Sequence, residues 1–155
     1  MTSKIIYLII PLMVFSVALI GSFFTGTGMD WYQGINLPEF TPPGSFIGLV
    51  WTLIFILTAI SILFALNKNL KERKNLVISF FVINLLLNLR WSFLFFNQHL
   101  IGLALIDAIL LALSVLILMV LIWPFSKFSS LLLLPYFLWV SFASYLNFII
   151  WQLNI

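Results

Sequence analysis

Five long apolar runs, separated by short polar segments, dominate the pattern of this chain. The runs cover residues 5–24, 45–66, 76–96, 101–123 and 129–153. Each has about 20 to 25 residues, the length that an α-helix needs to cross the hydrocarbon core of a bilayer. Charged side chains enter these runs at only two positions, Arg90 and Asp107. The pattern predicts an all-α integral membrane protein, in which residues 1–155 form a single membrane domain of five transmembrane helices.

Composition supports the membrane assignment and removes several classes of chemistry. Hydrophobic residues make up 64% of the 155 and charged residues only 7%, against about 25% charged in an ordinary soluble domain. The absence of Cys excludes disulfides, thiolate nucleophiles and Cys-ligated metals. Acidic residues are few and scattered, so we predict no metal site and no cofactor. His99, the single histidine, could ligate a haem axially, but its position in a turn favours a surface residue.

The distribution of basic residues predicts the orientation of the helices. With five spans, one side of the membrane carries six Lys and Arg residues and the other side carries none. The six are Lys4, Lys68, Lys71, Arg73, Lys74 and Lys127. By the positive-inside rule, the N-terminus is cytoplasmic and the C-terminus lies outside, in a cell membrane. We interpret residues 71–74 as a topology anchor, in preference to a nucleic-acid or lipid site. The run that follows Lys4 could also be a signal peptide cleaved after Ala18, but it continues to Phe24, as a first span would.

The segment of residues 25–44 is much longer than the other connections. Loops of this length in compact proteins are usually functional lids or disordered. Three prolines stiffen this one, and Trp31, Tyr32 and Phe40 give it side chains to bury. We therefore expect a folded lid over the outer end of the bundle. The alternative is an interfacial aromatic belt that holds Trp31 and Tyr32 among the lipid headgroups.

Polar residues inside the predicted spans gather in the outer half of the bundle. Arg90 and Asp107 lie at matching depths in consecutive antiparallel helices, so we expect them to pair. The pair could simply join the two helices, or it could shape a pocket. Asn84 and Asn88 share a helix face, and Asn147 could meet them from the last helix. Interhelical hydrogen bonding explains Asn88 and Asn147, whereas Asn84 could equally contact a ligand.

Small residues recur every four positions on the fourth predicted helix, at Ala104, Ala108 and Ala112. Such a stripe lets two helices approach closely. It could serve packing inside the bundle or a homodimer interface, and the sequence does not separate the two.

Several segments, taken in order, resemble the TspO/MBR family of tryptophan-rich sensory proteins and translocator proteins (peripheral benzodiazepine receptors). They are Trp31-Tyr32 with Leu37-Pro38 and Pro42-Pro43, Val50-Trp51-Thr52-Leu53, Asn88-Leu89-Arg90-Trp91-Ser92 with Phe95-Phe96, Ala104-Leu105-Ile106-Asp107, and Pro135-Tyr136-Phe137-Leu138-Trp139 with Phe142-Ala143 and Leu146-Asn147. The resemblance covers most of the chain and points to a bacterial member.

The resemblance implies a five-helix bundle, commonly a homodimer, with a pocket in its outward half that is closed by the first loop. It implies a receptor or sensor for porphyrins such as protoporphyrin IX and for isoquinoline carboxamide and benzodiazepine ligands. The positions that match the family pocket are Trp31, Trp51, Asn84, Trp91, Trp139, Ala143 and Asn147. Sterol binding is not expected, because no basic residue follows Tyr136 or Tyr145 as in the animal proteins.

Two other functions stay open from the sequence. Light- and oxygen-dependent breakdown of bound porphyrin is attributed to pocket tryptophans in bacterial members, and Trp51 and Trp139 match them, so the chain could be an enzyme. Both tryptophans could also be no more than large core residues. A transporter of porphyrin or lipid is the third function. Against it, the cytoplasmic half of every span is almost purely aliphatic and no inverted repeat is visible.

Overall fold

The computed structural model describes residues 3–155, and this part of the chain is helical without strands. Its elements are α1 (Ser3–Thr27), α2 (Met29–Gly34), α3 (Gly44–Leu66), η1 (Lys71–Arg73), α4 (Lys74–Ser92), η2 (Phe93–Asn97), α5 (Ile101–Ile122), α6 (Lys127–Leu132) and α7 (Leu134–Leu153). Five stretches are long and apolar enough to span a membrane: α1, α3, α4 with η2, α5, and α6 with α7. The predicted all-α membrane bundle is confirmed.

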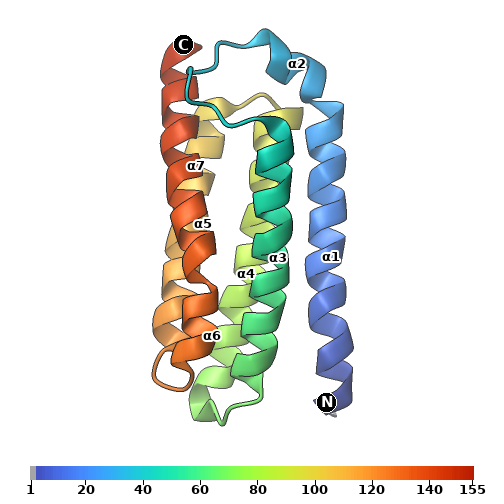
Figure 1. Cartoon of the computed structure of the whole chain (residues 1–155), viewed down its shortest axis with the longest axis vertical. Helices are drawn as coiled ribbons and strands as arrows, with labels where there is room; N and C mark the ends of the chain where they lie inside the picture. Colours follow the sequence, from blue (N-terminus) through green and yellow to red (C-terminus); the bar gives the residue numbers. More distant parts are fainter. Residues whose placement is uncertain (1–2) are drawn as a thin grey trace.

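The five spans stand side by side, with the N-terminus at one end and the C-terminus at the other (Figure 1). Helix α5 packs against both α4 and α7, while α1 packs against α3 and α4. Helix α2 and the loop behind it cross the end where the C-terminus lies. We call this the lid end. The opposite end carries η1, α6 and the exposed side chains of Lys68, Arg73, Lys74 and Lys127.

Apolar side chains form both the core and the outer surface, as expected of a bundle surrounded by lipid. Val77, Phe81, Val115 and Leu118 are among the fully buried core residues. Large apolar side chains also cover the outside of the bundle, including Leu86 at 59% exposure. Because lipid tails are as apolar as these side chains, the burial of apolar surface adds little to helix association. Close packing and interhelical hydrogen bonds must then contribute more to the stability of the bundle.

The alanine stripe on α5 serves packing within the bundle. Ala104 is 0% exposed and Ala108 is 3% exposed, and Ala112 is half-buried. Their small side chains allow α5 to lie close to its neighbours. Since Ala104 and Ala108 are covered within one chain, they serve packing inside the bundle.

Two spans depart from a simple helix. The fifth span is divided at Leu133 into α6 and α7, because Pro135 at the start of α7 has no backbone N–H for the carbonyl four residues earlier. The Ser126 side chain accepts a hydrogen bond from the Ser129 amide at the start of α6. The third span ends in a π-helix, η2, where the sequence pattern predicts an ordinary helix.

The half of the bundle farther from the lid end is less purely aliphatic than the sequence suggests. Ser61, Ser129 and Ser130 are buried there. Ser61 donates a hydrogen bond to the Ser129 carbonyl at 2.7 Å, and Ser130 donates one to the Met119 carbonyl at 2.9 Å. These hydroxyls bond to backbone carbonyls within the bundle and hold α6 against α3 and α5.

Candidate ligand-binding site

A pocket of about 550 Å³ lies in the lid half of the bundle. This volume falls in the range of about 300–1,000 Å³ that is usual for small-molecule sites. Side chains from α1, α2, α3, α4, η2, α5 and α7 line it, and they are mostly apolar. The aromatic members are Tyr32, Trp51, Phe55, Trp91, Phe95, Phe96, Trp139 and Phe142.

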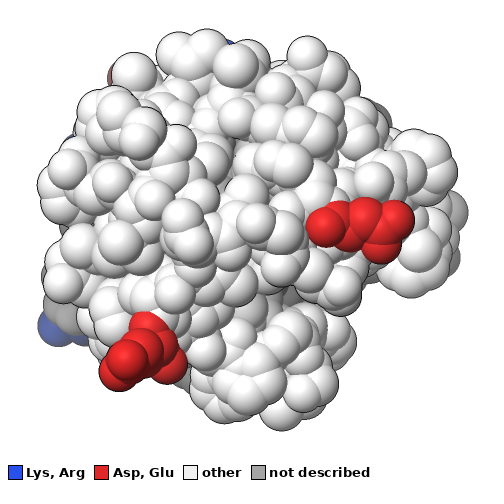
Figure 2. Space-filling model, turned by 90° about the horizontal axis from the view of Figure 1, so that it is seen from above, with Lys and Arg blue, Asp and Glu red and all other residues white. Residues whose placement is uncertain are grey.

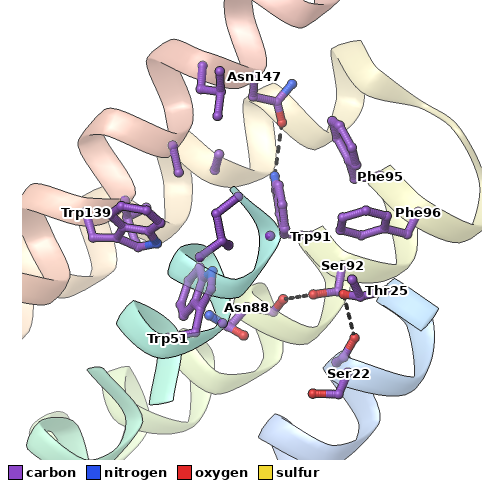
Figure 3. Close-up of a pocket in the computed structure, with 18 of the residues that line it drawn as sticks. Ser22, Thr25, Trp51, Asn88, Trp91, Ser92, Phe95, Phe96, Trp139 and Asn147 are labelled. Carbon is purple, nitrogen blue, oxygen red and sulfur yellow. Dashed lines mark hydrogen bonds between the residues drawn. The ribbon is translucent and has the colours of Figure 1, made fainter. Parts of the chain in front are cut away.

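Three tryptophans from three different helices face this pocket. Figure 3 shows Trp51 of α3 and Trp139 of α7 on one side, Phe95 and Phe96 on the other, and Trp91 of α4 between them. The Trp91 ring stacks on Phe95, with centroids 5.3 Å apart and planes 19° apart. Such a wall offers flat π-faces to a flat apolar ligand.

The indole N–H groups of Trp91 and Trp139 differ in their bonding. Trp91 Nε1 donates to Asn147 Oδ1 at 3.0 Å, and Asn147 Nδ2 donates to the Ile101 carbonyl at 3.0 Å. Trp139 Nε1 is buried and has no hydrogen-bond partner in the described part of the chain. Buried donors are normally paired, so this unpaired N–H sets Trp139 apart from Trp91.

A chain of hydrogen bonds leads from the pocket wall into the bundle. Asn88 lines the pocket, and its Nδ2 donates to Tyr136 Oη at 3.2 Å. Tyr136 Oη donates to Asn84 Oδ1 at 3.2 Å, and Asn84 Nδ2 donates to Ser114 Oγ at 2.9 Å. The Tyr136 ring also meets Trp51 edge-on at 5.9 Å. This chain joins α4, α5 and α7 directly beneath Trp51 and fixes the floor of the pocket.

Arg90 and Asp107 form the ion pair that the sequence predicts, and they join α4 to α5. Asp107 is 1% exposed, whereas the Arg90 side chain is 54% exposed. Neither residue lines the pocket, although Ala108 and Trp91 beside them do. The pair therefore joins the two helices and positions the neighbours that form the wall.

Helix α2 is held to the bundle by aromatic contacts. Trp31 stacks on the exposed His99 at 4.1 Å and meets Phe95 edge-on at 5.6 Å. Tyr32 packs against Phe96 and lines the pocket, and burial raises the pKa of its hydroxyl.

Two further features tie the lid end down. Gly28, between α1 and α2, lies so close to η2 that a Cβ there would sit 2.1 Å from the Phe96 carbonyl oxygen. Farther along, the Asn36 amide donates to Asn154 Oδ1 at 3.0 Å, and Asn154 Nδ2 donates to the Asn36 carbonyl at 2.9 Å. Asn36 Nδ2 also donates to the Leu153 carbonyl at 3.3 Å. The loop after α2 is thus attached to the end of α7.

Figure 2 views the molecule from the lid end, and two separate patches of Asp and Glu side chains are its most prominent charged features. Asp30 of α2 and Glu39 of the following loop are the exposed acidic residues of the lid segment. Basic residues of the described loops lie at the other end. Charge is therefore separated along the long axis of the bundle.

The structure brings together most of the residues that the sequence singles out. Trp51, Trp91, Trp139, Ala143 and Asn147 all line the pocket. Asn84 and Trp31 do not. Asn84 is 0% exposed and its amide is used by Tyr136 and Ser114, and Trp31 lies behind Phe95.

Other lining residues were missed as ligand contacts. Asn88 takes the position expected of Asn84, one helical turn nearer to the lid. Ser92, Phe95 and Phe96 also face the pocket, and the π-helical turn of η2 places the last two there. A π-turn in a span often marks a functional site, but apolar periodicity alone contains no signal for it.

Comparison with known proteins identifies the family of this chain. The model of the TspO/MBR family matches residues 9–152. The chain is 40% identical to the tryptophan-rich protein TspO of Archaeoglobus fulgidus over 144 residues, which cover 92% of this chain and 93% of the relative. It is 28% identical to the human translocator protein, and the match covers 94% of this chain and 90% of that protein. It is 26% identical to the tryptophan-rich sensory protein of Cereibacter sphaeroides, where the match covers 81% of this chain and 77% of the relative. With its five spans, this chain is a multi-pass membrane protein that belongs to the TspO/MBR family.

Proposed function

We propose that this protein is a membrane receptor or sensor that binds porphyrins, such as protoporphyrin IX, in the pocket of the lid half. The observation that carries the proposal is the convergence of Trp51, Trp91 and Trp139 on one largely apolar pocket. Indole faces stack on flat aromatic rings, and such a site needs only a few polar groups to orient its ligand. Isoquinoline carboxamides and benzodiazepines are also flat and aromatic, and they fit the same reasoning.

Within this proposal, the polar groups of the pocket orient the ligand. Trp139 Nε1 lacks a partner, so it can donate a hydrogen bond to a carboxylate or carbonyl of the ligand. Asn88 and Asn147 contribute amides that the bundle already holds in place. Ala143 leaves room beside Trp139 for the ring system. Trp31 contributes indirectly, through the packing of α2 on Phe95.

The names of the relatives are consistent with a sensor. One relative is a tryptophan-rich sensory protein and another a translocator protein. We further propose that the N-terminus is cytoplasmic and the C-terminus outside, because the exposed Lys68, Arg73, Lys74 and Lys127 gather at the end opposite the lid. A homodimer follows from the family resemblance, and its interface would have to exclude the buried stripe of Ala104 and Ala108.

A second candidate is an enzyme that degrades bound porphyrin with light and oxygen. The observation in its favour is that two oxidisable indoles, Trp51 and Trp139, line the same pocket. A sensor releases its tetrapyrrole unchanged, whereas an enzyme converts it. The two functions therefore differ in a directly measurable product.

The test is to titrate detergent-purified protein with protoporphyrin IX in the dark and then to illuminate the complex, for the wild type and Trp139→Phe. Saturable binding with porphyrin bands that bleach no faster than in a protein-free control supports the receptor. Light-driven loss of the bands in the wild type alone supports the enzyme and identifies Trp139. No saturable binding by the wild type would reject porphyrin as the ligand.

A further inference from the structure

The exposed residues of the pocket lining are confined to one part of the bundle. Its lining residues from α4, η2, α5 and α7 are all buried or half-buried. Every exposed lining residue belongs instead to α1, α2 or α3. These residues are Ser22, Gln33, Gly44, Gly48 and Thr52.

Small side chains face each other across this opening. Ala18, Gly21, Ser22 and Thr25 line the pocket from one face of α1, and Gly44, Gly48 and Thr52 line it from one face of α3. A Cβ built on Gly48 or Gly44 meets no atom within 4 Å. Space is therefore free beside these glycines, and we call the seam between α1 and α3 at this level the side slit.

Neighbouring seams of the same half are closed by aromatic pairs. Phe46 meets Trp139 between α3 and α7 at 6.1 Å, and Phe40 stacks on Tyr145 between the lid loop and α7 at 5.9 Å. Phe24 packs on Phe93 between α1 and η2 at 5.3 Å. No ring pair or hydrogen bond joins α1 to α3 in the described part of the chain. The lid loop itself is tied to α7 by Asn36 and Asn154.

The slit reaches into the depth of the hydrocarbon core. Thr52 lies eight residues after Gly44, the first residue of α3, and Ser22 lies five residues before the end of α1. At 1.5 Å per residue, these positions are about 12 Å and about 8 Å from the helix ends. The headgroup region takes up only about 5 to 8 Å on each side of a bilayer. With the ends of α1 and α3 placed at the membrane surface, the part of the slit beside Thr52 lies among the lipid tails.

We infer that the ligand enters and leaves the pocket sideways, through the slit between α1 and α3, from solution in the membrane. This inference rests on the proposed function and adds the class of ligand: an amphipathic molecule that partitions into the bilayer, with a flat apolar body and a polar group. The apolar body passes between the small residues of α1 and α3. Trp139 Nε1, which has no partner among the described residues, then donates a hydrogen bond to the polar group.

The first test needs no ligand and examines the slit alone. The chain has no Cys, so a nitroxide spin label can be placed at Thr52→Cys in protein reconstituted into liposomes. Leu53→Cys is the lipid-facing reference, because Leu53 is 51% exposed and does not line the pocket. Gln33→Cys is the reference at the water-facing edge. We expect the label at position 52 to collide with dissolved oxygen as at position 53 and to be shielded from a water-soluble nickel chelate. Chelate access as high as at position 33, or no access to either reagent, would overturn the inference.

The second test measures the passage of protoporphyrin IX from preloaded liposomes. Gly48→Phe adds a ring at a pocket-lining position where the new Cβ meets no atom within 4 Å. Gly34→Phe adds the same ring at an equally open, exposed site on α2 that does not line the pocket. We expect Gly48→Phe to slow both association and dissociation by about tenfold, as a blocked gate does, and Gly34→Phe to behave as wild type. Unchanged rates in Gly48→Phe, or faster release caused by mere filling of the pocket, would contradict side entry. Absence of porphyrin binding in the wild type would count against the proposed function only, since the spin-label result stands without it.

Discussion

Trp91 of α4 donates its indole N–H to Asn147 of α7, across 3.0 Å, at the wall of the pocket. Trp139, in the same pocket, has a buried indole N–H without a partner among the residues that the structure describes. One tryptophan thus joins two helices, while the other keeps a donor free. The same substitution at the two positions separates these roles.

Trp91→Phe should lower stability more than Trp139→Phe does. The first change leaves Asn147 Oδ1 without its donor, which costs about 0.6 to 1.7 kcal/mol for an interhelical hydrogen bond in a membrane. The second removes a donor that has no partner among residues 3–155, so its cost is limited to lost ring area. Thermal unfolding in detergent measures the difference. Equal losses of stability would show that the Trp91–Asn147 bond contributes nothing.

Gly28→Ala should destabilise the lid end. The new Cβ would lie 2.1 Å from the Phe96 carbonyl oxygen, so the backbone of η2 or the start of α2 must move. Overpacking of this kind costs about 1 to 3 kcal/mol. Gly26→Ala is the matched control, because a Cβ there meets nothing within 4 Å. Comparable melting temperatures for the two variants would refute the close approach of Gly28 to η2.

Removal of one partner from the Arg90–Asp107 pair should have unequal effects. In Arg90→Leu the carboxylate of Asp107, which is 1% exposed, loses its countercharge, at a cost of about 3 kcal/mol. In Asp107→Leu the half-exposed Arg90 can extend toward the membrane surface, so the loss should be smaller. The double Leu variant should be more stable than Arg90→Leu. A double-mutant cycle of unfolding free energies provides the measurement, and strictly additive losses would contradict a direct pair.

Asn154→Ala should loosen the loop that follows α2. It removes both hydrogen bonds between the Asn154 side chain and the Asn36 backbone. A loss of about 1 kcal/mol corresponds to about fivefold faster amide exchange of residues 35–43. Hydrogen-exchange mass spectrometry can follow this segment, with the exposed neighbour Gln152→Ala as control. If exchange is unchanged in Asn154→Ala, the loop is held by other contacts.

The sequence predicts the bundle well, because length and apolarity alone decide whether a helix can span a membrane. It also predicts the pairing of Arg90 with Asp107, since a charge in the hydrocarbon region needs a partner. Rotation of each helix is harder to predict, because spans that are apolar on all sides have almost no amphipathic stripe. For this reason Asn84 was a candidate for ligand contact, although the structure buries it behind Asn88.

The remaining differences arise from backbone features that apolar periodicity does not encode. The π-helical η2 turns Phe95 and Phe96 toward the pocket. Tyr136 of α7 sits at the centre of a hydrogen-bond chain whose other members are Asn84 and Asn88 of α4 and Ser114 of α5. Only the three-dimensional packing of α5 against both α4 and α7 brings them together.

The central claim, that the pocket binds a flat aromatic ligand, is tested most directly by filling the pocket. Ala143→Phe adds a ring to the pocket lining, whereas Ser141→Phe adds one on the exposed face of the same helix. Quenching of tryptophan fluorescence by protoporphyrin IX, titrated in the dark, gives the affinity of each variant. We predict saturable binding by the wild type and Ser141→Phe, and at least about tenfold weaker binding by Ala143→Phe, equivalent to about 1.4 kcal/mol. Equal affinity in all three proteins would place the ligand elsewhere and contradict the account.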